Sequence, residues 1–242
     1  MRNQTPVTDS FRISAKALGE VALSSFCPRC FWLKTHVKLP YQIFPGIFSS
    51  IDSYTKRAVH SWFDMHGSAP AWMTGLGEVA AYAPAPHHSK FNILDAETNT
   101  LLTGGPDEIL VLRDGSHVIV DYKTAKYTGA QDSLFPLYET QLNAYALISE
   151  QCGPQPVSAL ALVYMEPVTD QAAAQADANH RSDGFAMGFA ANVHPVNLNP
   201  GMIYPLLRKA REVYGASTPP ARRTGCSDCN LLDELIAVTQ ST

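Results

Sequence analysis

The chain has 242 residues, of which 45% are hydrophobic and 17% are charged, and its formal net charge is -4 at pH 7. This length and composition predict a single medium-sized domain with a packed core and exclude a wholly disordered chain. The charge excludes binding of nucleic acid through an overall basic field, so any polyanion must be met by a local patch or by metal ions.

The sequence contains no run of about 18 or more apolar residues, which predicts that no helix spans a membrane. The first residues also lack a hydrophobic signal segment. We therefore expect a cytoplasmic protein whose five cysteines do not form stable disulfides.

The N-terminal part of the chain predicts two helices. The first covers residues 13–26 and leads into an aromatic-rich segment. The second covers residues 49–66, with Ser50 as its N-cap and Gly67 as its C-terminal stop. The apolar residues at helical spacing, which predict its buried face, are Val59, Trp62 and Phe63.

The middle of the chain predicts β-structure. Residues 76–82 and 89–95 are candidate strands. Residues 104–125 predict a hairpin, because two strand-like runs flank Asp114-Gly115, a dipeptide that favours tight turns.

The remaining elements are helices and strands in alternation. A long helix is predicted to end near Gly153, and the apolar run 157–165 predicts a buried strand. Residues 168–183 are polar and rich in alanine, which predicts a mobile loop or an insertion. The last predicted elements are a strand within 184–196 and helices within 199–215 and 230–238. This order predicts a mixed sheet flanked by helices.

Asp121 and Lys123 lie two residues apart in the second strand of the hairpin, so their side chains share one face. The carboxylate can bind a hard divalent cation, while the lysine steadies a nucleophilic water or a phosphate oxygen. The alternative is an ordinary solvated charge pair. The apolar run 118–120 directly before Asp121 favours a buried position instead.

Asp107 is a candidate for a second carboxylate, and two carboxylates with open water positions suit Mg²⁺ or Mn²⁺. A strict two-residue loop would place Asp107 opposite Tyr122 and point its side chain away from Asp121. Glu108 would then be the competing carboxylate. Asp107 joins Asp121 only if the loop has three residues, or if the strand has a bulge or a bend at the preceding glycines.

Three residues outside the hairpin are further candidates. Gln141 and Tyr145 are four positions apart on the following helix, where they share one face and can position water, phosphate or a neighbouring side chain. The alternative is the polar edge of an amphipathic helix. His60 offers a neutral ring nitrogen as a metal ligand, and the alternative is a histidine hydrogen-bonded at the edge of the core.

Four of the five cysteines form two C-x-x-C pairs near opposite ends of the chain, Cys27/Cys30 and Cys226/Cys229. Four thiolates suffice for a tetrahedral zinc ion or for an iron–sulfur cluster, and the ligand count does not choose between them. A shared metal would clip the N-terminal region to the C-terminal tail. The alternative is two independent redox-active or free pairs.

Together, in this order, the motifs resemble the PD-(D/E)XK nuclease superfamily, and above all its RecB-like branch, which includes the CRISPR-associated adaptation nucleases that carry an iron–sulfur cluster. "GGPD" is similar to the Gly-x-x-Asp metal motif, "DYK" to the catalytic Asp-x-Lys, and "QLNAY" to the Gln-x-x-x-Tyr helix. His60 falls on the histidine-bearing helix, and "FCPRCFWLK" and "CSDC" resemble the cysteine segments. The resemblance extends from about Ser14 to Cys229.

The resemblance implies an α/β, restriction-endonuclease-like core of helix, three-stranded meander, helix and strand. Its mixed sheet would be flanked by helices, with a cysteine-bound metal staple joining the termini. Residues 1–242 would form one nuclease-like domain, in which residues 13–35 and 216–239 build a cysteine-cluster subdomain.

The implied activity is metal-dependent hydrolysis of phosphodiester bonds in DNA, exonuclease-like on single-stranded or end-bearing DNA. Lys123 would orient the attacking water and stabilise charge on the phosphate, while Gln141 and Tyr145 would support the site and contact DNA. The implied ligands of Mg²⁺ or Mn²⁺ are Asp107, Asp121, the carbonyl of Tyr122 and His60. The alternative is a non-cleaving nucleic-acid-binding or assembly protein that keeps the nuclease fold.

A 4Fe–4S cluster on Cys27, Cys30, Cys226 and Cys229 is also implied. The CRISPR-associated relatives usually have one cysteine before the core and three after it, whereas this chain has two and two, which keeps zinc as the alternative. The implied partners are DNA and the proteins of a DNA repair, recombination or CRISPR adaptation complex.

Overall fold

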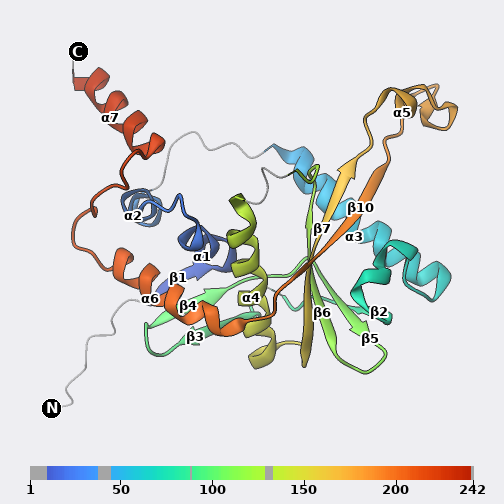
Figure 1. Cartoon of the computed structure of the whole chain (residues 1–242), viewed down its shortest axis with the longest axis horizontal. Helices are drawn as coiled ribbons and strands as arrows, with labels where there is room; N and C mark the ends of the chain where they lie inside the picture. The colour runs from blue at the N-terminus through green and yellow to red at the C-terminus, as the bar shows by residue number, and fades with distance from the viewer. Residues whose placement is uncertain (1–9, 38–44, 88, 129–132, 241–242) are drawn as a thin grey trace.

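The computed structural model describes residues 10–37, 45–87, 89–128 and 133–240. A five-stranded sheet stands between two helical layers, and a three-stranded sheet lies beside it (Figure 1). The elements of the N-terminal part are β1 (Phe11–Ser14), α1 (Ala15–Ala22), α2 (Pro28–His36), α3 (Gly46–His66) and the 3-10 helix η1 (Ala71–Leu76).

The middle of the chain supplies most of the strands. These are β2 (Val79–Ala83), β3 (Asn92–Asp95), β4 (Thr100–Thr103), β5 (Glu108–Leu112) and β6 (His117–Lys123). The C-terminal part contains the long helix α4 (Phe135–Cys152), the strands β7 (Val157–Pro167) and β10 (Phe189–Val196), and the helices α6 (Ile203–Tyr214) and α7 (Ser227–Gln240). Short elements between these are α5 (Gln171–Gln175), η3 (Asp177–Asn179), β8 (His180–Arg181), β9 (Gly184–Phe185) and η4 (Pro200–Met202).

The strand order of the large sheet is β10-β7-β6-β5-β2. β2, β5 and β6 pair antiparallel as a meander, whereas β6 pairs parallel with β7 after the crossover through α4. β10 returns antiparallel along β7. The expected mixed sheet flanked by helices, with its core of helix, meander, helix and strand, is therefore confirmed.

The two faces of β6 serve two different cores. Ile119 packs into the cluster that includes α1, α4 and α6, while Val118 and Val120 pack with Val59 and Phe63 of α3. All three residues of this apolar run are at most 1% exposed, as predicted from the sequence. The alternation follows from the two-residue period of a strand.

Several boundaries differ from the prediction. α3 begins at Gly46, after Pro45, and the hydroxyl of Ser50 bonds the Gly46 carbonyl inside the helix instead of capping it. Gly67 does end the helix, with a positive φ of 62°. Trp62 is 41% exposed and lies outside the buried face.

The three-stranded sheet, of order β1-β4-β3, was not predicted. β1 pairs parallel with β4, which lies far along the chain, and both strands have only four residues. Short strands with distant partners carry little periodic signal of their own. The residues at the start of the expected first helix form β1 instead.

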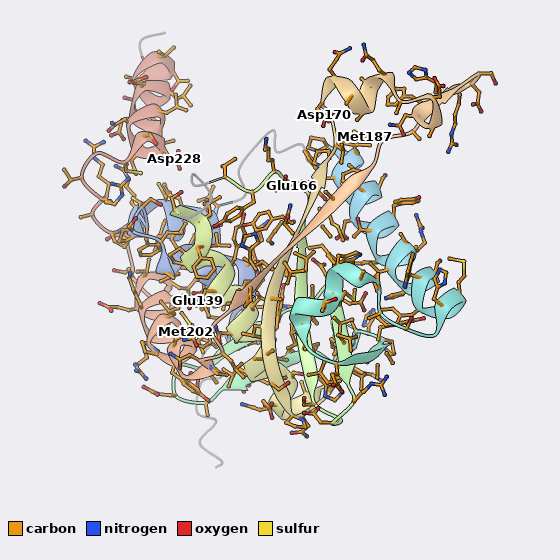
Figure 2. All side chains as sticks on the ribbon, turned by 45° about the vertical axis from the view of Figure 1, so that its right-hand side comes forward. Glu139, Glu166, Asp170, Met187, Met202 and Asp228 are labelled. Carbon is orange, nitrogen blue, oxygen red and sulfur yellow. The ribbon has the colours of Figure 1, made fainter. Side chains whose placement is uncertain are left out.

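Residues 168–183, expected to be a loop or an insertion, contain α5, η3 and β8. Together with β9 they extend β7 and β10 into an arm that projects from the body of the protein (Figure 1). Asp170 and Met187 mark this arm in Figure 2. No helix among the described residues is long and apolar enough to cross a membrane.

Asn143 fastens α4 to the chain that precedes α6. Its fully buried side-chain amide donates hydrogen bonds of 2.9 Å to the carbonyl oxygens of Glu139 and Asn197. Its Oδ1 accepts the backbone N–H of Asn199 at 2.6 Å. These bonds hold α4 in place over the sheet.

Replacing Asn143→Ala is expected to lower the free energy of unfolding by about 2–4 kcal/mol, because buried backbone groups lose their partners. Urea unfolding followed by circular dichroism measures the change. The control Asn230→Ala removes an exposed amide whose Oδ1 accepts from Arg222, and it should change stability by no more than about 0.5 kcal/mol. Equal stability of the two variants would contradict the role of Asn143.

Candidate active site and metal centre

The candidate active site lies at the C-terminal end of β6. Asp121 is 3% exposed, and its Oδ2 lies 2.5 Å from the Nζ of Lys123 on the same strand face. The Lys123 ammonium also stands over the ring of Tyr138 at 4.4 Å from the ring centre. The shared face predicted from the spacing of the two residues is thus confirmed.

The hairpin loop decides where Asp107 lies. Glu108 pairs with Val120, and the backbone N–H of Leu112 donates to the carbonyl oxygen of Ser116 at 2.8 Å, so residues 113–115 form a three-residue loop. Gly115, the last of these, has a φ of 85°, a conformation that glycine adopts without steric cost. Continued by one residue beyond Glu108, where β5 begins, this register would bring Asp107 level with Asp121, as the functional hypothesis required.

The carboxylate of Asp107 is tied to two elements. Its Oδ2 accepts the backbone N–H of Tyr122 at 2.9 Å, and its Oδ1 lies 2.7 Å from the Nζ of Lys56 on α3. Lys56 also pairs with Asp52 one turn earlier. Tyr122 itself points its ring to the opposite face of the sheet, where its hydroxyl is buried without a hydrogen-bond partner among the described residues.

α4 brings two polar side chains onto Asp121. The amide nitrogen of Gln141 donates to Asp121 Oδ1 at 2.9 Å and to the hydroxyl of Tyr145 at 2.7 Å. The Oε1 of Gln141 accepts from Lys123 at 3.5 Å. The predicted helical pair therefore meets the predicted Asp-x-Lys pair in one hydrogen-bonded network.

His60 lies elsewhere. Its Nε2 is 2.9 and 3.1 Å from the two carboxylate oxygens of Glu108, and its ring stacks on Tyr82 at 4.0 Å. Glu108 is opposite Val120 in the ladder, so it faces α3, whereas Asp121 faces α4. The structure thus joins His60 to Glu108 and does not show it in contact with Asp107 or Asp121.

Burial dominates the electrostatics of both carboxylates. It raises the pKa of Asp121 to about 6, against the opposing effect of Lys123 and with the assistance of the Asp107 charge. Burial also raises the pKa of Glu108, against the opposing effect of the hydrogen bond and charge of His60.

Lys56 was missed in the sequence, although it precedes His60 by four residues and shares its helical face. A lysine on an exposed helix is so common that only the contact with Asp107 distinguishes it. A cleft of about 540 Å³ lies next to the site and was also not predicted. Its lining includes Lys16, Phe48, Lys123, Tyr138 and Tyr164.

The two C-x-x-C pairs come together. Cys27, Cys226 and Cys229 are buried and Cys30 is half-buried, and their four sulfur atoms lie within 4.8 Å of one another. The four-cysteine cluster joins α2 to the first turn of α7, where Figure 2 labels Asp228. This arrangement confirms the predicted joining of the N-terminal and C-terminal regions and can bind a metal ion or a cluster.

Comparison with known proteins identifies the class. The family model of the PD-(D/E)XK nuclease superfamily matches residues 69–233, well over half of the chain. The chain therefore belongs to the PD-(D/E)XK nuclease superfamily, whose members act on nucleic acids and typically use divalent metal ions. The matched region contains Asp107, Asp121, Lys123, Gln141, Tyr145 and the second cysteine pair, but not His60, Lys56 or the first cysteine pair.

Among solved structures, the crystal structure of SSO0001 is similar to this chain at 14% identity, with a TM-score of 0.41. The match covers 88% of this chain and 80% of that one. No match is found among curated proteins.

Gly104 leaves room for the Tyr145 ring beneath the site. A Cβ at position 104 would lie 2.5 Å from Cε1 and 2.7 Å from Cδ1 of Tyr145, a side chain that is only 5% exposed. Gly104→Ala is therefore expected to displace the ring and lower the free energy of unfolding by about 1–3 kcal/mol in a urea titration.

Gly105→Ala is the matched control, since its Cβ would meet no atom within 4 Å. It should unfold within about 0.5 kcal/mol of the unmodified chain. Similar losses in both variants would mean that the space beside Tyr145 does not require glycine.

Proposed function

We propose that this chain is a Mg²⁺- or Mn²⁺-dependent deoxyribonuclease of the RecB-like branch, similar to the CRISPR-associated adaptation nucleases. It would hydrolyse phosphodiester bonds as an exonuclease on single-stranded or end-bearing DNA. The observation that carries the proposal is the buried Asp121 carboxylate, which Gln141 orients and Lys123 pairs. Burial of a charged carboxylate costs free energy, and carboxylates in such positions are frequent at functional sites.

The residues present fit a hard divalent cation. Asp121 Oδ2 accepts no hydrogen bond from the described residues, although it is buried and lies near Lys123 Nζ. Asp107 and Asp121 would hold the ion, together with the carbonyl of Tyr122, since hard cations prefer oxygen ligands. The ion would offset negative charge on the phosphate and help to generate the nucleophile from water.

Two residues of α3, Lys56 and His60, lie near this proposed ligand set. Lys56 pairs with Asp107, so an ion at that carboxylate must compete with its ammonium or share the group with it. We leave His60 outside the set, because its Nε2 is bonded to Glu108. Its proposed role is to hold the Glu108 carboxylate by hydrogen bonds and so anchor the start of β5.

Lys123 would act directly on the substrate. Its Nζ is held between the Asp121 carboxylate and the face of the Tyr138 ring, which fixes its position at the end of β6. From there it would orient the attacking water and stabilise charge on the phosphate. Gln141 and Tyr145 would fix Asp121 and support DNA binding.

The cleft beside the site supports a single strand as the substrate. Lys16 and Lys123 offer ammonium groups for phosphates, and the aromatic residues Phe48 and Tyr138 offer rings for stacking. Single-stranded nucleic acids are commonly bound by such combinations of basic and aromatic side chains. This mode of DNA binding is compatible with the net charge of -4, because the proposed contacts are local and do not require a basic field over the whole protein.

Asp121→Asn and Lys123→Ala should each reduce the rate of DNA cleavage by about 100-fold or more, because each removes a charge that acts on the reacting phosphate or its metal ion. The assay follows labelled single-stranded, linear duplex and closed circular DNA with Mg²⁺ or Mn²⁺. Asp114→Asn and Lys90→Ala are controls away from the site and should cut like the unmodified chain.

If Asp121→Asn and Lys123→Ala cut as fast as these controls, the proposed site is wrong. Cleavage of linear but not closed circular DNA supports the exonuclease mode, and cleavage of the circle contradicts it. Binding of DNA with no cleavage under either metal would favour the alternative, a non-cleaving nucleic-acid-binding or assembly protein.

Metal binding should weaken as the pH falls through about 6, the pKa to which burial raises the Asp121 carboxyl. The deprotonated carboxylate is the ligand, so affinity for Mn²⁺ should be about tenfold lower at one pH unit below this pKa. Calorimetric titration at several pH values measures the effect. Equal affinities across this range would show that Asp121 does not hold the ion.

A further inference from the structure

The four sulfur atoms of the cysteine cluster lie close together, all within 4.8 Å of one another. The Sγ of Cys27 lies 3.7 Å from that of Cys229, and the Sγ of Cys30 lies 3.5 Å from Cys226 and 3.4 Å from Cys229. All four cysteines are free, and these separations exceed the about 2 Å of a disulfide bond. The sulfurs therefore form one compact group of four instead of two disulfide-bonded pairs.

The size of this group of sulfurs distinguishes the two candidate metal centres, a zinc ion and a 4Fe–4S cluster. Four sulfurs at about 2.3 Å from one zinc ion form a tetrahedron with edges of about 3.8 Å. In a 4Fe–4S cluster each thiolate binds a different iron, so the thiolates surround the whole core of irons and sulfides and stand much farther apart. With every sulfur within 4.8 Å of the others, the cluster has room for one ion and not for that core.

The surroundings supply a hydrogen-bond donor to one of the sulfurs. Among the described residues, the small hydrophobic cluster at this place consists of the four cysteines. The backbone N–H of Arg223 donates to Cys27 Sγ at 3.3 Å, and the Arg223 guanidinium is held by the carbonyl oxygens of Ser25 and Thr224. A backbone N–H donor favours the deprotonated form of the sulfur that it contacts, here that of Cys27.

We propose that Cys27, Cys30, Cys226 and Cys229 bind one tetrahedral zinc ion, in place of the 4Fe–4S cluster that the resemblance implies. Each thiol releases its proton to solvent as its sulfur binds the ion, which leaves a site of net negative charge beside Arg223. This inference concerns the composition of the metal centre and does not rest on the proposed nuclease activity.

The zinc ion would strengthen the contact between the α2 region and the C-terminal part of the chain, which otherwise depends on a few polar interactions. The indole N–H of Trp32 donates to the carbonyl of Ala216 at 2.8 Å, and Arg29 pairs with Asp233 at 3.4 Å on the exposed surface. Exposed ion pairs contribute little stability. A cavity of about 380 Å³, lined by Cys30 and Lys34 among others, adjoins the cluster and gives the ion a path from solvent.

The first experiment is metal and sulfide analysis of the full chain, purified without oxygen from cells supplied with both iron and zinc. We expect about one zinc per chain, no acid-labile sulfide and a colourless protein. Iron and sulfide at about four per chain in a brown protein would overturn the proposal. A folded protein without bound metal would overturn it too.

Cys229→Ser tests the ligands, with Cys152→Ser as the matched control. Cys152 is exposed, and its thiol donates to the carbonyl oxygens of Asn92 and Ile148. The control should retain about one zinc per chain, whereas Cys229→Ser should lose most of it. Equal zinc content in the two variants would contradict the assignment.

X-ray absorption at the zinc edge gives a readout that does not depend on a variant that folds. The unmodified chain should show four sulfur neighbours at about 2.3 Å, and nitrogen or oxygen neighbours in their place would overturn the proposal. None of these measurements uses DNA. A chain that binds zinc but cuts no DNA would leave this inference intact and refute the proposed function.

Discussion

The burial of the Asp121 carboxylate is the constraint on which the rest of the site depends. A charge in such a position costs several kcal/mol unless an opposite charge and hydrogen bonds meet it. Lys123 comes from the same strand, but Gln141 comes from α4, so this helix must keep a fixed place over β6. The parallel pairing of β6 with β7 and the buried bonds of Asn143 hold the helix there.

The three-residue loop of the hairpin sets the position of β5 relative to Asp121 on β6. Because it sets the register, Asp107 comes level with Asp121 while Glu108 turns to the other face. α3 contacts both carboxylates through residues one turn apart, because Lys56 pairs with Asp107 and His60 bonds Glu108. One helix thus contacts two adjacent acidic residues, which face opposite sides of the sheet.

α4 also links the active site to the cysteine cluster. Leu137 lines the cavity beside the cysteines, and the next residue, Tyr138, lies under the Lys123 ammonium. The cysteine cluster, which joins α2 to the start of α7, therefore lies on the side of the protein where α4 begins (Figure 1). The two centres are chemically separate, but they share the helix that positions Lys123 and Asp121.

Local periodicity by itself determined much of this protein. The buried run before Asp121, the common face of Asp121 and Lys123, the pair Gln141 and Tyr145, and the two C-x-x-C turns follow from the geometry of one strand, one helix or one turn. Tertiary structure alone decided the loop register that brings Asp107 to the site, the partner of His60, the sheet that joins β1 to β4, and the spacing of the four sulfurs. Each of these depends on contacts between segments far apart in the chain, whose distances no local pattern encodes.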